Sequence, residues 1–142
     1  PSTYMNAKNG ILQKRAESDI ATEMCRKLRV KTPSYEKIVN QLSGGNQQKV
    51  IIAKWLMMYP KVLILDEPTR GIDVGAKSEI YQIMNELTEQ GVSIIMISSD
   101  MEEIMGMADR ILVMCEGKIS GELHKGEYTQ EKILEYAAEV KK

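Results

Sequence analysis

Residues 42–50 read LSGGNQQKV and residues 62–68 read VLILDEP, with about one helix of chain between them. The second stretch is a short apolar run that ends in two adjacent carboxylates, Asp66 and Glu67. A continuous apolar run of this length, bounded by a proline and an acid, is typical of a buried parallel strand. Together the two stretches predict an α/β fold whose polar groups gather where a strand ends and a helix begins.

A second apolar run at 92–97 follows a helical pattern at 76–90. Four apolar side chains in that pattern recur at helical spacing: Ile80, Ile83, Met84 and Leu87. Gly91 follows the pattern and is a favourable residue for ending a helix. Strand, helix and strand at this spacing predict a βαβ unit with two parallel, buried strands.

Two more helices are expected before this unit. An amphipathic helix should run from Leu12 to Leu28, and Thr32-Pro33-Ser34 should end it. The next helix should cover 44–58, where Val50, Ala53 and Met57 form the predicted inner face and Trp55 is expected to be packed. Residues 1–41 are predicted to be a mostly helical segment and residues 42–142 the α/β core.

The C-terminal part predicts a short helix, a hairpin and a closing helix. Asp100 should cap the short helix, with Glu103 as its capping-box partner. The hairpin should span 111–123 around a Glu-Gly turn, and the closing helix should span 129–140.

Composition narrows the function classes. The chain has 142 residues, of which 43% are hydrophobic and 27% charged, as in an ordinary globular protein. A net charge of −1 gives no broad electrostatic footprint for nucleic acid. No apolar run reaches the roughly 20 residues needed to cross a bilayer. We therefore expect no nucleic-acid partner and no direct insertion into a membrane.

The paired carboxylates suggest phosphate chemistry. Asp66, at the end of its strand, is placed to bind Mg²⁺ directly or through water. Glu67, one residue further on, can act as general base toward an attacking water. Ligands of open α/β sheets bind beyond the carboxyl ends of the strands. Taken alone, the same four residues LDEP could be no more than an acidic turn.

Ser43, Gly44 and Gly45 precede a predicted helix, and helix N-termini bind anions through free backbone N–H groups. The glycines let the backbone approach a phosphate closely, and Ser43 can add a hydroxyl donor. For the tripeptide alone, the simpler interpretation is a serine N-cap followed by a glycine turn. The nine-residue string is much more specific than that.

From residue 42 to about 123 the chain resembles the ABC (ATP-binding cassette) nucleotide-binding domain. LSGGNQQKV resembles its signature, and VLILDEP resembles its Walker B strand with the catalytic glutamate. Further matches are AKWL at 53–56, LILDEPTRGIDVGAK at 63–77, ISSDMEEI at 97–104 and DRILVM at 109–114. The chain is especially similar to the second cassette of tandem ATPases that drive ribose, galactose and xylose import, which share Asn46 where most ABC proteins have Gln. Before residue 42 the similarity is weak and rests on position more than motif.

This resemblance implies a partial P-loop NTPase fold and MgATP as substrate. Each ATP would lie between the P-loop of one cassette and the signature of the other, so Ser43, Gly44, Gly45 and Asn46 would serve the partner cassette's ATP. Asp73 would be the acid of the D-loop, which packs against the partner cassette. The implied partners are that cassette and membrane permease subunits, which hold the protein peripherally on the cytoplasmic side of the inner membrane.

Two departures from the family pattern stand out. No Gly-rich loop ending in Lys-Ser or Lys-Thr occurs in these 142 residues, so the phosphate cradle and its lysine are missing. Ser99 also stands where the family usually has a switch histidine, and serine cannot carry an imidazolium charge. We therefore expect the signature to serve a partner's ATP while the chain's own Walker side is weak or inactive. A neutral substitution at a strand end is the simpler interpretation of Ser99.

Two other functions fit the sequence less well. The isolated chain could be a non-catalytic module that self-associates through an open sheet edge. An ABC ATPase of DNA repair or chromosome organisation would carry long coiled coils before the signature, and the chain before residue 42 has no sustained heptads.

Overall fold

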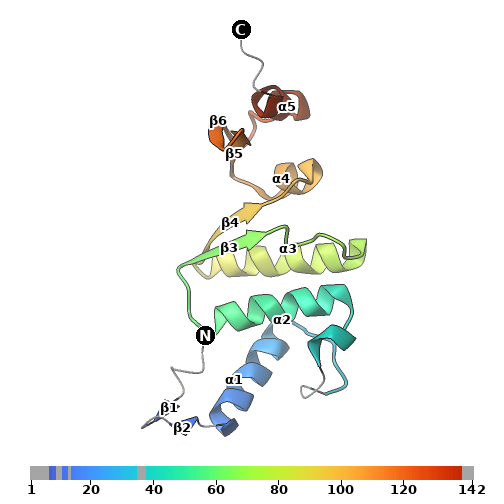
Figure 1. Ribbon diagram of the computed structural model, residues 1–142, viewed down its shortest axis with the longest axis vertical. Helices are drawn as coiled ribbons and strands as arrows, with labels where there is room; N and C mark the ends of the chain where they lie inside the picture. The colour runs from blue at the N-terminus through green and yellow to red at the C-terminus, as the bar shows by residue number, and fades with distance from the viewer. Residues whose placement is uncertain (1–6, 9–10, 13, 35–37, 139–142) are drawn as a thin grey trace. The chain divides into compact units, whose positions relative to one another are not determined.

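The computed structural model describes residues 7–8, 11–12, 14–34 and 38–138, with side chains from residue 18 onward. The chain divides into two compact units, Pro1–Ile97 and Ser98–Lys142. Each unit is considered by itself. The helices and strands are labelled in Figure 1. The proposed boundary between 1–41 and 42–142 stays a prediction, and the helices on either side of it lie in the same unit.

The first unit contains short strands β1 (Ala7–Lys8) and β2 (Ile11–Leu12), helix α1 (Lys14–Lys27), the 3₁₀ turn η2 (Val39–Gln41), and helices α2 (Gly44–Leu56) and α3 (Val74–Glu89). Its parallel strands are β3 (Val62–Asp66) and β4 (Ser93–Ile97). The βαβ unit β3–α3–β4 is therefore confirmed. The antiparallel pair β1–β2 was not expected from the sequence.

Helix α1 ends earlier than predicted, because Arg29 adopts a left-handed conformation with φ 55°. The backbone N–H of Val30 donates to the Cys25 carbonyl and that of Arg29 to the Arg26 carbonyl, which is the Schellman pattern of helix ends. Val30 is buried, so its side chain anchors the turn. The segment Thr32-Pro33-Ser34 lies beyond the helix and does not end it.

The apolar face of α3 is confirmed, and that of α2 needs correction. Ile80, Ile83, Met84 and Leu87 are all buried. On α2 the buried residues are Gly45, Lys49, Ile52, Ala53 and Leu56. Of the predicted inner face only Ala53 is buried, and Trp55 is exposed rather than packed. The buried face of the helix differs from the predicted one because it includes a lysine and a glycine, which a search for hydrophobic residues does not select.

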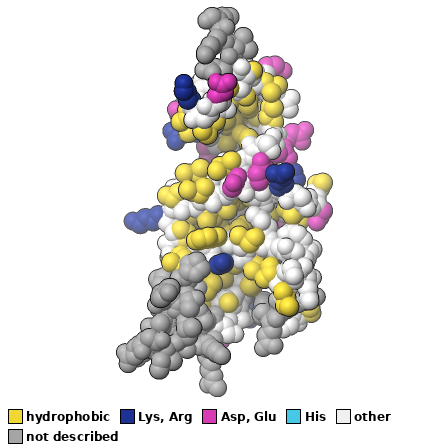
Figure 2. Space-filling model, in the orientation of Figure 1, with side chains coloured by type: hydrophobic (Ala, Val, Ile, Leu, Met, Phe, Trp, Pro, Cys, Tyr) yellow, Lys and Arg dark blue, Asp and Glu magenta, His cyan; other side chains and the backbone are white. Residues whose placement is uncertain are grey.

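The β3–β4 pair is parallel, with Val62 opposite Ser93 and Asp66 opposite Ile97. The prediction that both strands are fully buried is wrong, because β3 alternates exposed and buried side chains. Only Leu63 and Leu65 of β3 are buried, on the face that α3 covers (Figure 1). Hydrophobic side chains gather over the other face of this sheet (Figure 2), and the large exposed ones there are Val62, Ile64, Ile95 and Ile97.

The second unit contains α4 (Met101–Met107), the antiparallel strands β5 (Arg110–Cys115) and β6 (Lys118–His124), and α5 (Gln130–Ala138). The predicted hairpin turns at Glu116 and Gly117, both with positive φ, as a tight hairpin turn requires. A core of Ile111, Val113, Leu123 and Ile133 is covered by Met101, Ile104, Met105, Ala108 and Tyr128. The predicted short helix and hairpin are thus confirmed.

In neither unit does the described chain contain a helix that is both long and apolar enough to cross a membrane.

Candidate functional site

The residues that resemble the signature, the D-loop and Walker B gather at one end of the first unit. Contacts of Gly45 with Ala76 and of Lys49 with Glu79 show that α2 and α3 run in the same direction. Helix α3 returns from the carboxyl end of β3 to the start of β4, so it begins where β3 ends. The N-termini of α2 and α3 therefore lie at the end of the unit where β3 ends (Figure 1). Asp66 is the last residue of β3, and Glu67 follows it.

Ser43 precedes α2 in an extended conformation, and its side chain makes no capping bond to the helix. Its hydroxyl instead accepts a hydrogen bond of 2.8 Å from Asn46 Nδ2. The first helical bond of α2 runs from the Gln47 N–H to the Ser43 carbonyl. The N–H groups of the three residues between them have no intrahelical acceptor, as at every helix start. This arrangement argues against Ser43 as a plain N-cap and leaves its own O–H proton available to a ligand.

The signature glycines are packed against the start of α3. A Cβ added at Gly45 would lie 2.5 Å from the Cβ of Ala76, and one added at Gly44 would lie 3.2 Å from Ile72 Cγ2. Gly45 is buried, so its lack of a side chain is required by packing within this chain. From the sequence, the two glycines were expected either to let a phosphate approach the backbone or to form a turn after a serine N-cap. Packing is a second and independent reason for them.

Asp73 caps α3, because its Oδ1 accepts a 2.9 Å hydrogen bond from the Ala76 N–H. Asp73 itself is exposed. The cap fixes the segment that resembles the D-loop directly beside the first turn of α2. The predicted D-loop acid therefore has a structural role in its own chain, in addition to any contact with a partner.

Asp66 is exposed at the carboxyl end of β3, on the same face as Val62 and Ile64. Glu67 is half-buried and has φ 48°, a left-handed conformation that costs a non-glycine residue roughly 1–2 kcal/mol. Its N–H donates to the Ile97 carbonyl at 2.8 Å, which extends the β3–β4 ladder by one residue. Such strained positions concentrate at functional sites.

The donor set at Asp66 fits a magnesium ion held partly by phosphate oxygens and water. No group of three or more His, Cys, Asp or Glu residues able to hold a metal occurs within the described ranges. Mg²⁺ usually takes one or two carboxylates and completes its shell with water and substrate phosphates. One exposed carboxylate at a strand end meets that requirement.

Ser99 is the second residue of the second unit, two residues after the end of β4, and it is exposed. The residues around it form a tight cap for α4. Ser98 Oγ lies 2.5 Å from Glu103 Oε2 and accepts from the Asp100 N–H, and Asp100 Oδ1 accepts from the Glu103 N–H. The predicted cap by Asp100 is confirmed, with Ser98 as an additional member. The structure holds Ser99 in this ordered turn.

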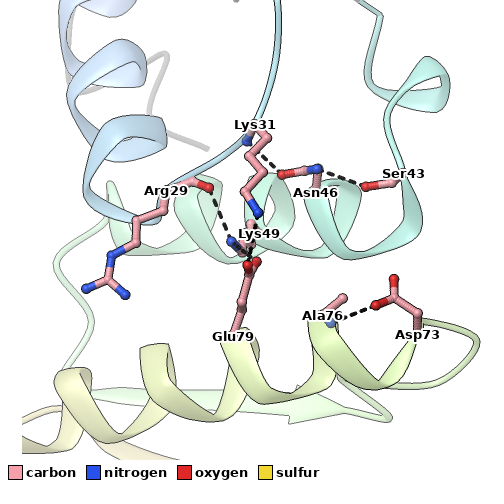
Figure 3. Close-up of polar contacts among 8 residues, drawn as sticks. All are labelled: Arg29, Lys31, Ser43, Asn46, Lys49, Asp73, Ala76 and Glu79. Atoms are coloured by element: carbon pink, nitrogen blue, oxygen red, sulfur yellow. Dashed lines mark hydrogen bonds and ion pairs between the residues drawn. The ribbon is translucent and has the colours of Figure 1, made fainter.

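A polar network that the sequence argument missed lies next to the signature (Figure 3). Lys49 Nζ is 2.6 Å from Glu79 Oε2 and 3.2 Å from the Arg29 carbonyl, and the lysine is only 2% exposed. Lys31 Nζ lies 3.1 Å from the other Glu79 oxygen. The Lys31 backbone N–H donates to Asn46 Oδ1 at 2.7 Å. The network thus joins the end of α1, the signature helix α2 and α3.

Electrostatics agree with this geometry. Hydrogen bonds from Lys49 and then Lys31 lower the pKa of the Glu79 carboxyl below its usual 4.5. In the sequence, the only pointer to this network was the position of Lys49, which shares a helix face with Gly45 and Ala53. A buried lysine is rare without a paired acid, so the amphipathic pattern did not point to it.

The ABC transporter family model matches residues 2–70. The ribose import ATP-binding protein RbsA of Oceanobacillus iheyensis is 60% identical over 131 residues, which cover 92% of this chain and 26% of that protein. The chain is therefore similar to ABC transporter ATP-binding proteins over most of its length. The putative ribose/galactose/methyl galactoside import ATP-binding protein of Pseudomonas savastanoi pv. phaseolicola is 54% identical over 132 residues, or 93% of this chain and 25% of that protein.

Solved cassettes have the same fold. The dimeric structure of MJ0796, a bacterial ABC transporter cassette, matches with a TM-score of 0.70 and 25% identity over 84% of this chain and 51% of that one. These matches confirm the α/β cassette fold and the resemblance to sugar-importer cassettes. The matches extend into the segment before residue 42, where motifs were weak. The chain spans about a quarter of the length of the curated relatives and about half of that solved cassette.

Proposed function

We propose that this chain supplies the signature and Walker B part of an ATP-hydrolysing cassette that powers sugar import. The observation that carries the proposal is the gathering of the Ser43-Gly44-Gly45 helix start with Asp66 and Glu67 at one end of the first unit. Relatives named as ribose import ATP-binding proteins, 60% identical to this chain, support the sugar importer. The substrate would be MgATP and the cargo a sugar of the ribose or galactose class.

Each candidate residue has a role in this proposal. The N–H groups at the start of α2 and the Ser43 hydroxyl would bind phosphate oxygens of ATP held by another cassette. Asp66 would hold Mg²⁺, which would neutralise phosphate charge. Glu67 would accept a proton from the attacking water. Ser99 would stand at the γ-phosphate position as a neutral hydrogen-bond donor.

The proposed division of labour follows from these roles. The signature of this chain would serve the partner's ATP, while the chain's own Walker side, with Ser99 in place of histidine, would be weak or inactive. Asp73 and the D-loop would contact the partner cassette. Closure of the two cassettes would be transmitted to permease subunits. The complete protein would then lie at the cytoplasmic side of the cell membrane as a peripheral subunit.

Turnover of MgATP by the isolated chain, with Glu67→Gln as the blank, tests the incompleteness of the site. We expect no activity above the blank, because neither a P-loop nor its lysine is present in this sequence. Turnover that depends on Glu67 would mean that other groups of this chain hold the phosphates, and the proposed half-site would be wrong.

A second candidate, a self-associating non-catalytic module, is favoured by the apolar sheet face. Ile64 is 63% exposed and Ile95 52% exposed, on adjacent positions of neighbouring strands. Light scattering of the isolated chain, compared with Ile64→Thr, tests this candidate. A dimer that Ile64→Thr dissociates supports it, and a monomer at all concentrations argues against it.

A further inference from the structure

Two ties, one helical turn apart, hold α2 against α3. Gly45 packs on Ala76, and four residues later Lys49 pairs with Glu79. Residues four apart on α2 and three apart on α3 lie on one face of each helix, so the two contacts form consecutive rungs between the helices. The first contact, between Gly45 and Ala76, is apolar and leaves no room for a side chain on the glycine. The second contact is an ion pair in which Lys49 is the buried partner.

A third tie reaches the signature serine. Asn46 accepts from the Lys31 N–H through Oδ1 and donates to Ser43 Oγ through Nδ2 (Figure 3). Because the Lys31 N–H is a donor, the atom facing it must be the amide oxygen, which fixes the orientation of the amide. The hydroxyl of Ser43 thereby takes a defined position. Lys31 is tied to the same Glu79 that receives Lys49.

We propose that Lys49, Glu79 and Asn46 are positioning residues of the phosphate site at the start of α2. Lys49 and Glu79 fix the helix against α3 and its Asp73 cap, and Asn46 fixes the Ser43 hydroxyl against Lys31. The N–H groups of the signature and the D-loop then move as one body when cassettes close. This inference rests on the proposed function, since it concerns how that function's ATP site is held in shape.

The chemistry requires such rigidity. Hydrogen-bond donors stabilise a developing charge only if they are held in place before the reaction. A displacement of about 1 Å at a catalytic group can cost on the order of a hundredfold in rate. Neither Lys49 nor Glu79 needs to touch ATP. Lys49 cannot, because its ammonium is buried between Glu79 and the Arg29 carbonyl.

Lys49→Met in the full-length protein is the primary test. The methionine fills the lysine's volume, and Glu79 is 42% exposed and can be solvated, so the fold should survive. We expect kcat for ATP to fall about tenfold to a hundredfold with KM changed less than about twofold, because the partner's P-loop still holds the nucleotide. Amide hydrogen exchange at residues 43–46 should accelerate without nucleotide. Lys49→Arg should restore most of kcat.

Glu86→Gln is the matched control. Glu86 lies on α3, carries the same charge as Glu79 and forms an ion pair of 2.9 Å with Arg29, which lies outside α2. Its kcat and exchange should match wild type. Wild-type kcat in Lys49→Met, or a loss that only matches the unfolded fraction, would overturn the inference. If Lys49→Met does not fold, Asn46→Ala replaces it, and wild-type kcat there overturns the inference equally.

Ser43→Arg separates this inference from the proposed function. If Ser43→Arg keeps full turnover, the signature does not serve an ATP and the proposed function itself fails. If Ser43→Arg loses turnover while Lys49→Met keeps it, the proposed function stands and only the positioning role is wrong.

Discussion

Gly45 and Ala76 approach so closely that a Cβ on the glycine would lie 2.5 Å from the alanine Cβ. This contact joins the signature helix to the helix that follows the D-loop, inside one chain. Gly45 resembles a nucleotide-binding residue of the signature, and it is also the point where two helices of one chain pack together. Its substitution should affect stability even without ATP.

Gly45→Ala should destabilise the first unit of the full 142-residue chain by about 1–3 kcal/mol, the usual cost of overpacking a core. The clash involves the Cα-bound methyl of a helical residue, which cannot rotate away. Urea unfolding of the full chain, followed by circular dichroism so that both units contribute to the signal, measures the effect. Gly106→Ala is the control, because nothing lies within 4 Å of the added methyl in α4. It should be neutral or stabilising by up to about 1 kcal/mol, and equal effects of both changes would contradict the packing.

Removing either partner of the Lys49–Glu79 pair should have unequal effects. Glu79→Gln leaves a 2% exposed ammonium with a neutral partner and should cost about 1–3 kcal/mol. Lys49→Met leaves only a partly exposed carboxylate and should cost less. Thermal unfolding of both variants tests the order. The surface pair variant Glu86→Gln should stay within about 0.5 kcal/mol of wild type, and a reversed order would mean that Lys49 is not buried.

The stability contributed by Glu79 should depend on pH. Its pKa is lowered in the folded state, first by the hydrogen bond from Lys49. A group with a depressed folded pKa stabilises the fold above its unfolded pKa, here about 4.5, and that stability is lost as pH falls through the folded pKa. The difference in unfolding free energy between wild type and Glu79→Gln should therefore be constant from pH 7 to about 5.5 and shrink below 4.5. A difference that grows on acidification would refute the pairing.

Asp73→Ala should cost about 1 kcal/mol by removing the cap of α3, and Asp73→Asn should recover most of that stability. The two variants separate capping from charge. If the D-loop role of Asp73 needs the carboxylate, ATP turnover of the full-length protein stays low in Asp73→Asn although its melting temperature recovers. If ATP turnover and melting temperature both recover in Asp73→Asn, the role of Asp73 is limited to capping α3.

Patterns that repeat along the chain were predictable from the sequence. The i, i+3, i+4, i+7 spacing of α3 and the apolar runs at 62–65 and 92–97 gave the βαβ unit, and the Glu-Gly turn gave the hairpin. The burial of β3 was overestimated because an apolar run does not reveal which face is covered. The strands β1 and β2, with two residues each, are too short to leave an alternation.

The candidate site was predictable to a different degree. Ser43, Asp66 and Glu67 were found because a motif names them, and the structure brings them to one end of a unit. Lys49 and Glu79 were not found, since their pairing depends on how α2 and α3 pack, over a separation of 30 residues. Partners that distant in sequence leave no local pattern.

ATP hydrolysis by the full-length protein carrying Ser43→Arg tests the central claim most directly. An arginine at the exposed start of α2 leaves the fold intact but blocks the approach of phosphate to the helix N–H groups. The account predicts loss of about a hundredfold or more in kcat, with a far smaller loss in Glu67→Gln if the chain's own Walker side is weak. Undiminished turnover in Ser43→Arg would contradict the claim that this signature completes an ATP site.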